Sequence, residues 1–232
     1  MERLNLGLPN KAIYNQFIPK KEFYEQGEFT ERDKRIFIEG IDRITLHAQL
    51  TRANTNVAEY NDEERNYIEL SILNVRLKDK AFIEKIAELI MSSIPYPMLL
   101  VGLYKEGTIF YVAHQRENRA DSERTVLENI YSTDFIGFDN EFIDTIQYDK
   151  LNKQNLFTLY DSYVQAVLDY NLQKRNIISD TDRERLWAEI VNMETKIEEL
   201  RGQLKNERHF NRQMDLNIKI KRLENKLKNM EG

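Results

Sequence analysis

Apolar and polar residues alternate most regularly near the middle of the chain, where the sequence predicts two core strands. Residues 67–72 alternate between apolar and polar side chains, with Ile68, Leu70 and Ile72 on one face. A period of two is typical of a half-buried strand. Residues 98–104 are almost continuously apolar, as in a central strand that is buried on both faces.

A helix is predicted between these two strands, because apolar side chains recur at helical spacing from Asp79, a candidate N-cap, to about Ser93. This connection favours a parallel, right-handed crossover. A turn at 105–107 then leads to a third strand over 108–113. Residues 125–133 predict a fourth strand at the sheet edge, although a short helix also fits their pattern.

The N-terminal part of the chain is expected to cover this core. Residues 1–29 carry two prolines and several large apolar side chains, which predicts an extended arm that lies on the core. Thr30 and Asp33 have the spacing of a capping box, and the apolar residues that follow predict a first helix to about Leu46. The polar stretch 49–65 that follows is expected to be a loop or a short edge element.

The C-terminal part has the heptad spacing of a coiled coil. We expect a helix from about 153 to 170, a linker to 178, and a new helix that starts at a capping box formed by Thr181 and Glu184. Two apolar seams follow at alternating spacings of four and three. They consist of Leu186, Ile190, Met193, Ile197, Leu200 and Leu204, and then of Leu216, Ile220, Leu223 and Leu227.

The two seams are out of phase, so the helix geometry changes between Lys205 and Asn211. We favour a turn, with Asn206 as a left-handed C-cap and Asn211 as the next N-cap. The two arms would then fold back as an antiparallel hairpin. The competing interpretation is one continuous helix with a stutter, which would dimerise with a second copy.

The predicted fold is therefore α+β. It has a mixed three- or four-stranded sheet with helices mainly on one face, and a C-terminal antiparallel α-helical coiled-coil hairpin. The predicted divisions are a core domain with its extended arm at 1–150, a connecting helix and linker at 151–178, and the coiled-coil hairpin at 179–232.

Composition supports a long solvated helical segment, because charged residues make up 31% of the 232 residues and the mean hydropathy is −0.64. The chain has no cysteine, which excludes disulfides and thiolate metal sites and fits a cytoplasmic setting. No apolar run approaches the ~20 residues that span a bilayer, and the N-terminus lacks the pattern of a secretory signal. We expect no membrane association.

Charge is distributed unevenly along the chain, whose net charge is −5. Residues 201–232 hold nine basic and four acidic side chains, whereas residues 180–200 hold seven acidic and three basic ones. Opposite charges favour pairing of the two arms, and the basic arm is the strongest candidate for a binding surface. The residues that we predict to bind a partner are Phe210, Asn211, Arg212, Asn217, Lys219 and Lys221.

The sequence lacks the common motifs of catalytic and phosphate-binding sites. It contains no Gly-rich phosphate loop, no G-x-S-x-G and no H-E-x-x-H. Glu69 lacks the lysine two residues on that a nuclease site would favour. His114 begins a polar stretch, 114–124, which we interpret as a solvated strand end and a loop. We therefore predict no catalytic residue, no metal ligand and no cofactor.

Four stretches that follow one another along the chain carry a family resemblance. They are Leu6-Gly7-Leu8-Pro9, Ile18-Pro19-Lys20-Lys21 with Phe23-Tyr24, Ile94-Pro95-Tyr96-Pro97, and Phe210-Asn211-Arg212 with Leu216-Asn217. Together they resemble the bacterial family catalogued as domain of unknown function 4391. Leu46 and Phe135 stand where that family often carries tryptophan. The resemblance implies an accessory protein encoded beside DNA methyltransferases and helicases in restriction-like or phage-defence gene clusters.

Three functions follow as expectations. The first is a non-catalytic adaptor whose hairpin binds a protein partner, such as a helicase or DNA methyltransferase subunit. The second is a nucleic-acid-binding or metal-dependent nuclease component that uses the basic C-terminal helix. The third is a homodimer built through continuous helices.

Overall fold

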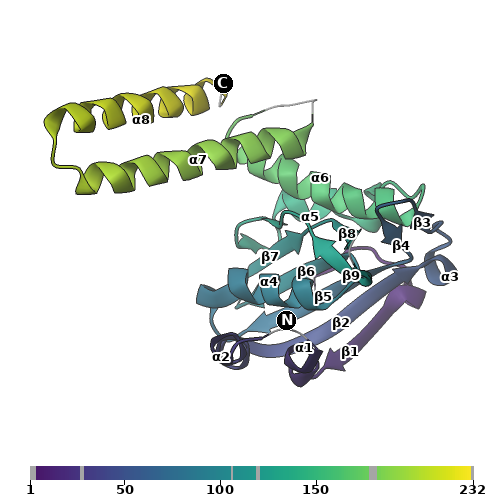
Figure 1. Cartoon of the computed structure of the whole chain (residues 1–232). Helices are drawn as coiled ribbons and strands as arrows, with labels where there is room; N and C mark the ends of the chain where they lie inside the picture. Colours follow the sequence, from purple (N-terminus) through teal and green to yellow (C-terminus); the bar gives the residue numbers. More distant parts are fainter. Residues whose placement is uncertain (1–3, 27–28, 106, 119–120, 178–181, 231–232) are drawn as a thin grey trace. The chain divides into compact units, whose positions relative to one another are not determined.

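The computed structural model divides the chain into two compact units at Val167 and Leu168 (Figure 1). One helix, α6 (Leu156–Lys174), crosses the division. Within the described part of the chain, no helix is long and apolar enough to cross a membrane. The structure describes residues 4–26, 29–105, 107–118, 121–177 and 182–230.

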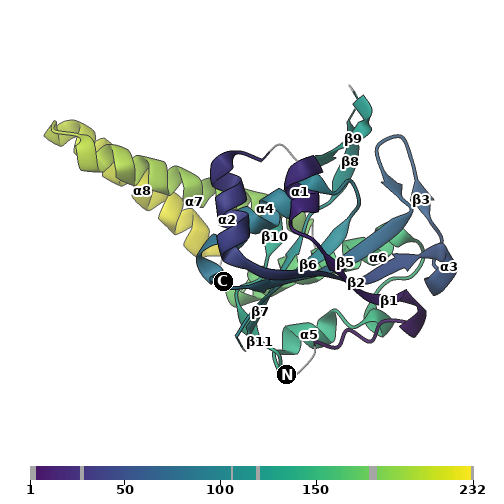
Figure 2. The same cartoon turned by 90° about the horizontal axis from the view of Figure 1, so that it is seen from below.

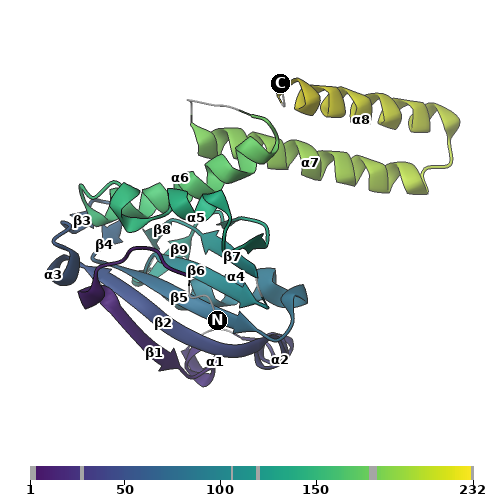
Figure 3. The same ribbon diagram turned by 180° about the vertical axis from the view of Figure 1, so that it is seen from behind.

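A mixed sheet forms the centre of the first unit, with strand order β1-β2-β5-β6-β7-β10 and β11 also paired with β7. Neighbouring strands are antiparallel except β5 and β6, which are parallel. Figure 3 shows β1 at the edge beside β2. The strands are β1 (Ile13–Ile18), β2 (Ile41–Thr51), β5 (Glu69–Leu77), β6 (Met98–Tyr104), β7 (Gly107–Val112), β10 (Tyr131–Ser132) and β11 (Ile136–Gly137).

Smaller elements surround this sheet. Two further strand pairs are β3 (Tyr60–Asn61) with β4 (Asn66–Tyr67), and β8 (Gln115–Asn118) with β9 (Asp121–Leu127). The helices are α1 (Lys21–Gln26), α2 (Glu31–Gly40), α3 (Arg52–Thr55), α4 (Ile83–Ser93) and α5 (Glu141–Thr145). Single 3-10 turns are η1 (Asn10–Ala12), η2 (Lys80–Phe82) and η3 (Tyr148–Lys150).

Several local predictions are confirmed. The capping box of Thr30 and Asp33 starts α2, with both reciprocal hydrogen bonds present. The Asp79 side chain accepts a hydrogen bond from the backbone N–H of Ala81 and so caps η2, which leads into α4. This helix joins two parallel strands, as the crossover rule requires. Strand β6 is buried along most of its length.

The prediction of one helix from Thr30 to Leu46 is wrong, because α2 ends at Gly40 and Ile41 begins β2. A side chain at position 40 would bring a Cβ atom to 2.8 Å from Cδ1 of Ile86, so glycine permits the close approach of α4. Beyond it, β2 is paired with β1 on one side and β5 on the other. This pairing outweighs the helical pattern of the same apolar residues.

The predicted sheet is too small, and its helices are on both faces. Strand β1 comes from the N-terminal arm and β2 from the supposed first helix, so the described sheet has seven strands. Helices α2 and α4 pack on one face through Phe37 and Ile86. On the other face Phe142 of α5 contacts Phe110, with ring centroids 5.3 Å apart. The Tyr160 hydroxyl of α6 donates to the Met98 carbonyl. Figure 2 shows α2 and α4 opposite α5.

Two parts of the polar stretch 114–124 are strands instead of the predicted loop, namely β8 (Gln115–Asn118) and the start of β9 (Asp121–Leu127). Strands β8 and β9 pair with each other outside the main sheet. The predicted edge strand over 125–133 is therefore split. Its first residues belong to β9, and only Tyr131–Ser132 (β10) lies against β7 in the main sheet.

The described part of the second unit contains the end of α6 and two further helices, α7 (Arg183–Asn206) and α8 (Phe210–Met230), which pack antiparallel to each other (Figure 1). Apolar clusters between them include Ile197, Leu200 and Ile220. The ion pairs Lys226–Glu189 and Arg201–Glu224 join the helices at 2.6 and 2.7 Å. Of the ten seam residues, Ile190, Met193, Ile197, Leu200 and Ile220 are buried; Leu186, Leu204, Leu216, Leu223 and Leu227 pack against them partly exposed.

The ends of these helices differ from the predicted caps. Thr181 lies outside the described residues, and the side chain of Asp182 caps α7 by accepting from the Arg185 N–H. At the other end the C-cap is Glu207, in an extended conformation, so the predicted left-handed cap at Asn206 is wrong. Asn211 lies inside α8 and is not its N-cap. The separate helices also contradict the continuous-helix interpretation.

Candidate functional site

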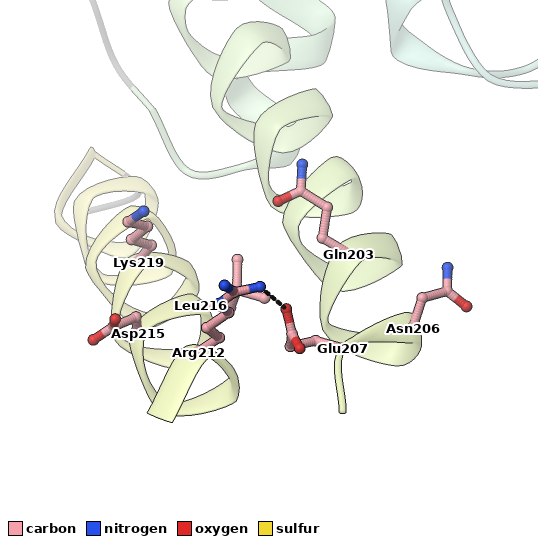
Figure 4. A pocket seen from close by; sticks show the side chains of 7 residues that line it. All are labelled: Gln203, Asn206, Glu207, Arg212, Asp215, Leu216 and Lys219. Carbon is pink, nitrogen blue, oxygen red and sulfur yellow. Dashed lines mark ion pairs between the residues drawn. The ribbon is translucent and has the colours of Figure 1, made fainter. Parts of the chain in front are cut away.

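The six residues predicted to bind a partner are all exposed, but they lie on different sides of α8. Arg212 and Lys219 line an open pocket between the helices, close to the turn (Figure 4). Phe210, Asn217 and Lys221 follow one another at spacings of seven and four, which places them together on another side of the helix. The pocket is lined by Gln203, Asn206, Glu207, Arg212, Asp215, Leu216 and Lys219.

Three exposed apolar residues form a row along α8. The sequence predicted Phe210 as a binding residue but not the row as a whole. Phe210, Met214 and Ile218 are 71%, 50% and 43% exposed. Their spacing of four residues places them in one row along the helix. Asn217 and Lys221 flank this row. The signal was present in the sequence, because Met214 and Ile218 fall outside the seam of α8 while keeping the period of Phe210.

The charges of α8 are only partly neutralised within the hairpin. The helix carries six basic and two acidic residues. Arg212 lies 3.8 Å from Glu207, and Lys226 pairs with Glu189 of α7. Lys219, Lys221, Arg222 and Lys228 have no ion pair among the residues that the structure describes. Within the described residues, the ion pairs of the hairpin therefore leave four of the six basic residues of α8 unpaired.

The pocket beside Lys219 combines charges of both signs. The backbone N–H groups of His209 and Arg208 donate to Glu207 at 2.9 and 2.8 Å. The first of these bonds is the largest cause that holds the pKa of Glu207 below its ordinary value. Glu207 and Asp215 stand against Arg212 and Lys219, so charge alone selects neither an anion nor a cation there.

A second cluster of polar groups lies inside the first unit, around His114. The Tyr67 hydroxyl lies 2.8 Å from Nδ1 of His114, and Oδ1 of Asp161 lies 3.2 Å from Nε2. An ionised carboxylate can only accept, so Nε2 carries a proton, and in the neutral imidazole Nδ1 then accepts from the tyrosine. His114 is 4% exposed, and the interpretation of this position as a solvated strand end is wrong. The network joins β4, the β7–β8 connection and α6.

Aromatic and charged groups close the cluster on its outer side. The Phe157 ring stacks on His114 with centroids 5.2 Å apart, and the Arg65 guanidinium lies over the same ring at 5.6 Å. Arg65 also donates to the Glu128 carboxylate at 2.9 Å and to the Gln115 carbonyl at 3.2 Å. The contacts of Arg65 tie the β3–β4 hairpin to α6, to β8 and to the residue that follows β9.

The electrostatics of the cluster follow from burial opposed by hydrogen bonding. Burial raises the pKa of Tyr67 to about 12. Burial would also raise the pKa of Asp161, but hydrogen bonds from His114 and Gln165 outweigh it and hold that pKa below its ordinary value. Burial would lower the pKa of Arg65, and the ion pair with Glu128 reverses that effect. The charged forms of Asp161 and Arg65 are therefore favoured.

The burial of this cluster favours a structural role over ligand binding. Tyr67 is only 1% exposed, so its hydroxyl is shielded from solvent. The hydrogen bond between Nε2 of His114 and Oδ1 of Asp161 orients both side chains within the fold. We therefore treat the outer surface of α8 as the candidate site.

The chain belongs to the family described as Domain of unknown function (DUF4391), whose model matches residues 6–227. The match includes parts of both units, and it confirms the resemblance that the sequence motifs indicate. Comparison with curated proteins and with solved structures finds no match.

Proposed function

We propose that this protein is a non-catalytic adaptor that binds a protein partner through the outer surface of α8. The observation that carries the proposal is the exposed row of Phe210, Met214 and Ile218. Single exposed apolar residues are normal on protein surfaces. Three in register on one helix, beside unpaired cations, are typical of a helix that docks on another protein.

The energetics favour an interaction of this kind. Removing an apolar side chain of this size from water stabilises a complex by about 1.5–3 kcal/mol before the costs of association. The hairpin itself does not need the row, because its own contacts use Ile197, Leu200 and Ile220. The row is thus available for a partner without loss of the packing between α7 and α8.

The family resemblance suggests which partners to test first. They are a DNA methyltransferase or a helicase subunit of a restriction-like or phage-defence system. The four unpaired cations of α8 favour nucleic acid as a second candidate, and the expected signature would be binding that weakens steeply with salt.

Affinity capture with the full chain tests the proposal. We expect the wild-type chain to retain a candidate partner and the double variant Met214→Glu with Ile218→Glu to lose it, because each substitution places an unpaired charge in the buried contact. Ile38→Glu is the matched control, since Ile38 is also apolar and 49% exposed but lies on α2. Circular dichroism would verify that all variants keep their helices. Equal capture by the double variant would overturn the proposal.

A further inference from the structure

The apolar row on α8 is short and continues into positive charge. Eight residues separate Phe210 from Ile218, a length of about 12 Å along a helix. Lys221 lies three residues beyond Ile218 and Arg222 lies four beyond it, so both continue the same surface toward the end of α8. The character of the surface therefore changes along α8. It is apolar next to the turn and basic farther along the helix.

The free cations on this surface differ from those on the pocket side. Lys219 and Lys221 are both exposed and both lack an ion pair within the described residues. Lys219, however, lines the pocket with Glu207 and Asp215. Lys221 is not among the residues of that pocket, and it continues the row of Ile218. A partner that binds the apolar row would therefore contact Lys221, whereas Lys219 would stay in the pocket outside this contact.

A second copy of the chain fits this surface poorly. Association of two α8 helices would bring together two helices that each carry six basic and two acidic residues, so like charges would oppose it. Nucleic acid explains the cations but gives no role to the exposed Met214 and Ile218.

We infer that the occupant is an acidic amphipathic helix of a partner protein. Its apolar side chains would pack against Phe210, Met214 and Ile218, and its carboxylates would pair with Lys221 and Arg222. Helix packing buries both flanks of the row, and the charge pairing fixes the direction of the partner helix. This inference rests on the proposed function and adds the chemical class of the partner.

Two synthetic peptides of about 20 residues, long enough to form an amphipathic helix, provide the test. They share one leucine face, and their other positions are mainly glutamate in one peptide and mainly lysine in the other. Fluorescence anisotropy with the full chain would measure their dissociation constants. We expect the acidic peptide to bind, with binding weakened by about tenfold or more in Met214→Glu and in Lys221→Glu.

The matched control is Lys219→Glu, which makes the same charge change on the same helix but on the pocket side. We expect it to alter the dissociation constant by less than about twofold. Equal loss in Lys219→Glu and Lys221→Glu, or binding of the lysine peptide, would overturn the inference. Tighter binding of a DNA duplex, weakened by both lysine substitutions, would assign the surface to phosphate. A dimer in light scattering that Met214→Glu dissociates would assign it to a second copy.

The two proposals can fail separately. If capture of a protein partner depends on Met214 and Ile218 but not on Lys221, and the acidic peptide does not bind, then the adaptor proposal stands and the acidic helix is wrong. If the row can be substituted without effect in both experiments, the adaptor proposal itself fails.

Discussion

His114 receives a hydrogen bond from Tyr67 at one ring nitrogen, 2.8 Å away, and donates to Asp161 from the other, 3.2 Å away. Both partners lie 47 residues from it along the chain. The imidazole therefore holds together three segments that are distant in sequence. Because the network is buried, its removal should affect stability strongly.

Tyr67→Phe removes one hydroxyl and leaves Nδ1 of His114 without its donor. The Gln115 N–H, 3.4 Å from that hydroxyl, also loses a contact. We expect the free energy of unfolding to fall by about 1–3 kcal/mol, the cost of unsatisfied buried polar groups. Urea denaturation would measure it. Tyr60→Phe is the control, since the Tyr60 hydroxyl bonds the exposed Asp62 and its loss should cost less. Equal effects would show that the network contributes little.

Asp161 should make the fold sensitive to acid. Its pKa lies below the ordinary carboxyl value, so the unfolded chain takes up this proton at a higher pH than the folded chain. The stabilisation is complete above the unfolded pKa and is lost as the pH falls through the folded pKa. Asp161→Asn keeps the acceptor oxygen but removes the charge. The variant should be less stable near neutral pH, and the difference from wild type should shrink toward pH ~3.

Thermal unfolding at a series of pH values would test this difference. Other carboxylates also lose their charge in acid, so the informative quantity is the gap between wild type and Asp161→Asn at each pH. A gap that stays constant from neutral to acidic pH would contradict a role for the charge of Asp161.

The sequence predicted best those elements whose signals are local. The capping box at Thr30 lies within four residues, and the apolar run 98–104 identifies a buried strand without knowledge of its neighbours. Strand β2 was missed because Ile41 and Ile44 also fit a helical stripe. Its strand conformation depends on pairing with β1 and β5, which come from distant parts of the chain.

The candidate binding residues show the same difference between local signals, which the sequence contains, and contacts with distant segments, which it does not. Lys221 was predicted from the charge and spacing of the basic arm, and Phe210 was indicated by the family resemblance. That Lys219 lines a pocket with residues of α7 could be seen only once α7 was placed against α8. The turn residue Glu207 was missed because the sequence pattern drew attention to asparagines as caps. A carboxylate that accepts from the next two backbone N–H groups has no periodic signature.

Two glycines should respond oppositely to alanine. At Gly202, in α7, an added Cβ would have nothing within 4 Å, so Gly202→Ala should raise the free energy of unfolding by about 0.5–1 kcal/mol through helix propensity. At Gly102, in β6, the Cβ would lie 2.7 Å from Cγ2 of Ile109. Gly102→Ala should destabilise the fold by about 1–3 kcal/mol through overpacking. Denaturant midpoints would compare them, and the same sign for both would contradict the packing described here.

The turn between α7 and α8 depends on Glu207. Its carboxylate accepts from the N–H groups of Arg208 and His209, which would otherwise lack partners before α8 begins. Glu207→Ala removes both bonds and should increase amide hydrogen exchange at the turn and in the first turn of α8. Arg212→Gln is the control, because Arg212 is 72% exposed and 3.8 Å from Glu207; loss of so exposed an ion pair should change exchange little.

Glu207→Ala also distinguishes between the hairpin and the continuous helix, which the sequence pattern allowed as an alternative. If Glu207 ends α7, Glu207→Ala should loosen the turn without adding helix, and the chain should keep its oligomeric state. If the turn is only one of two competing states, alanine, the best helix former, should favour the continuous form. Helical circular dichroism would then rise, and light scattering would show a dimer, because an extended seam needs a second copy to cover it. That result would reassign α8 from a docking surface to a dimerisation arm.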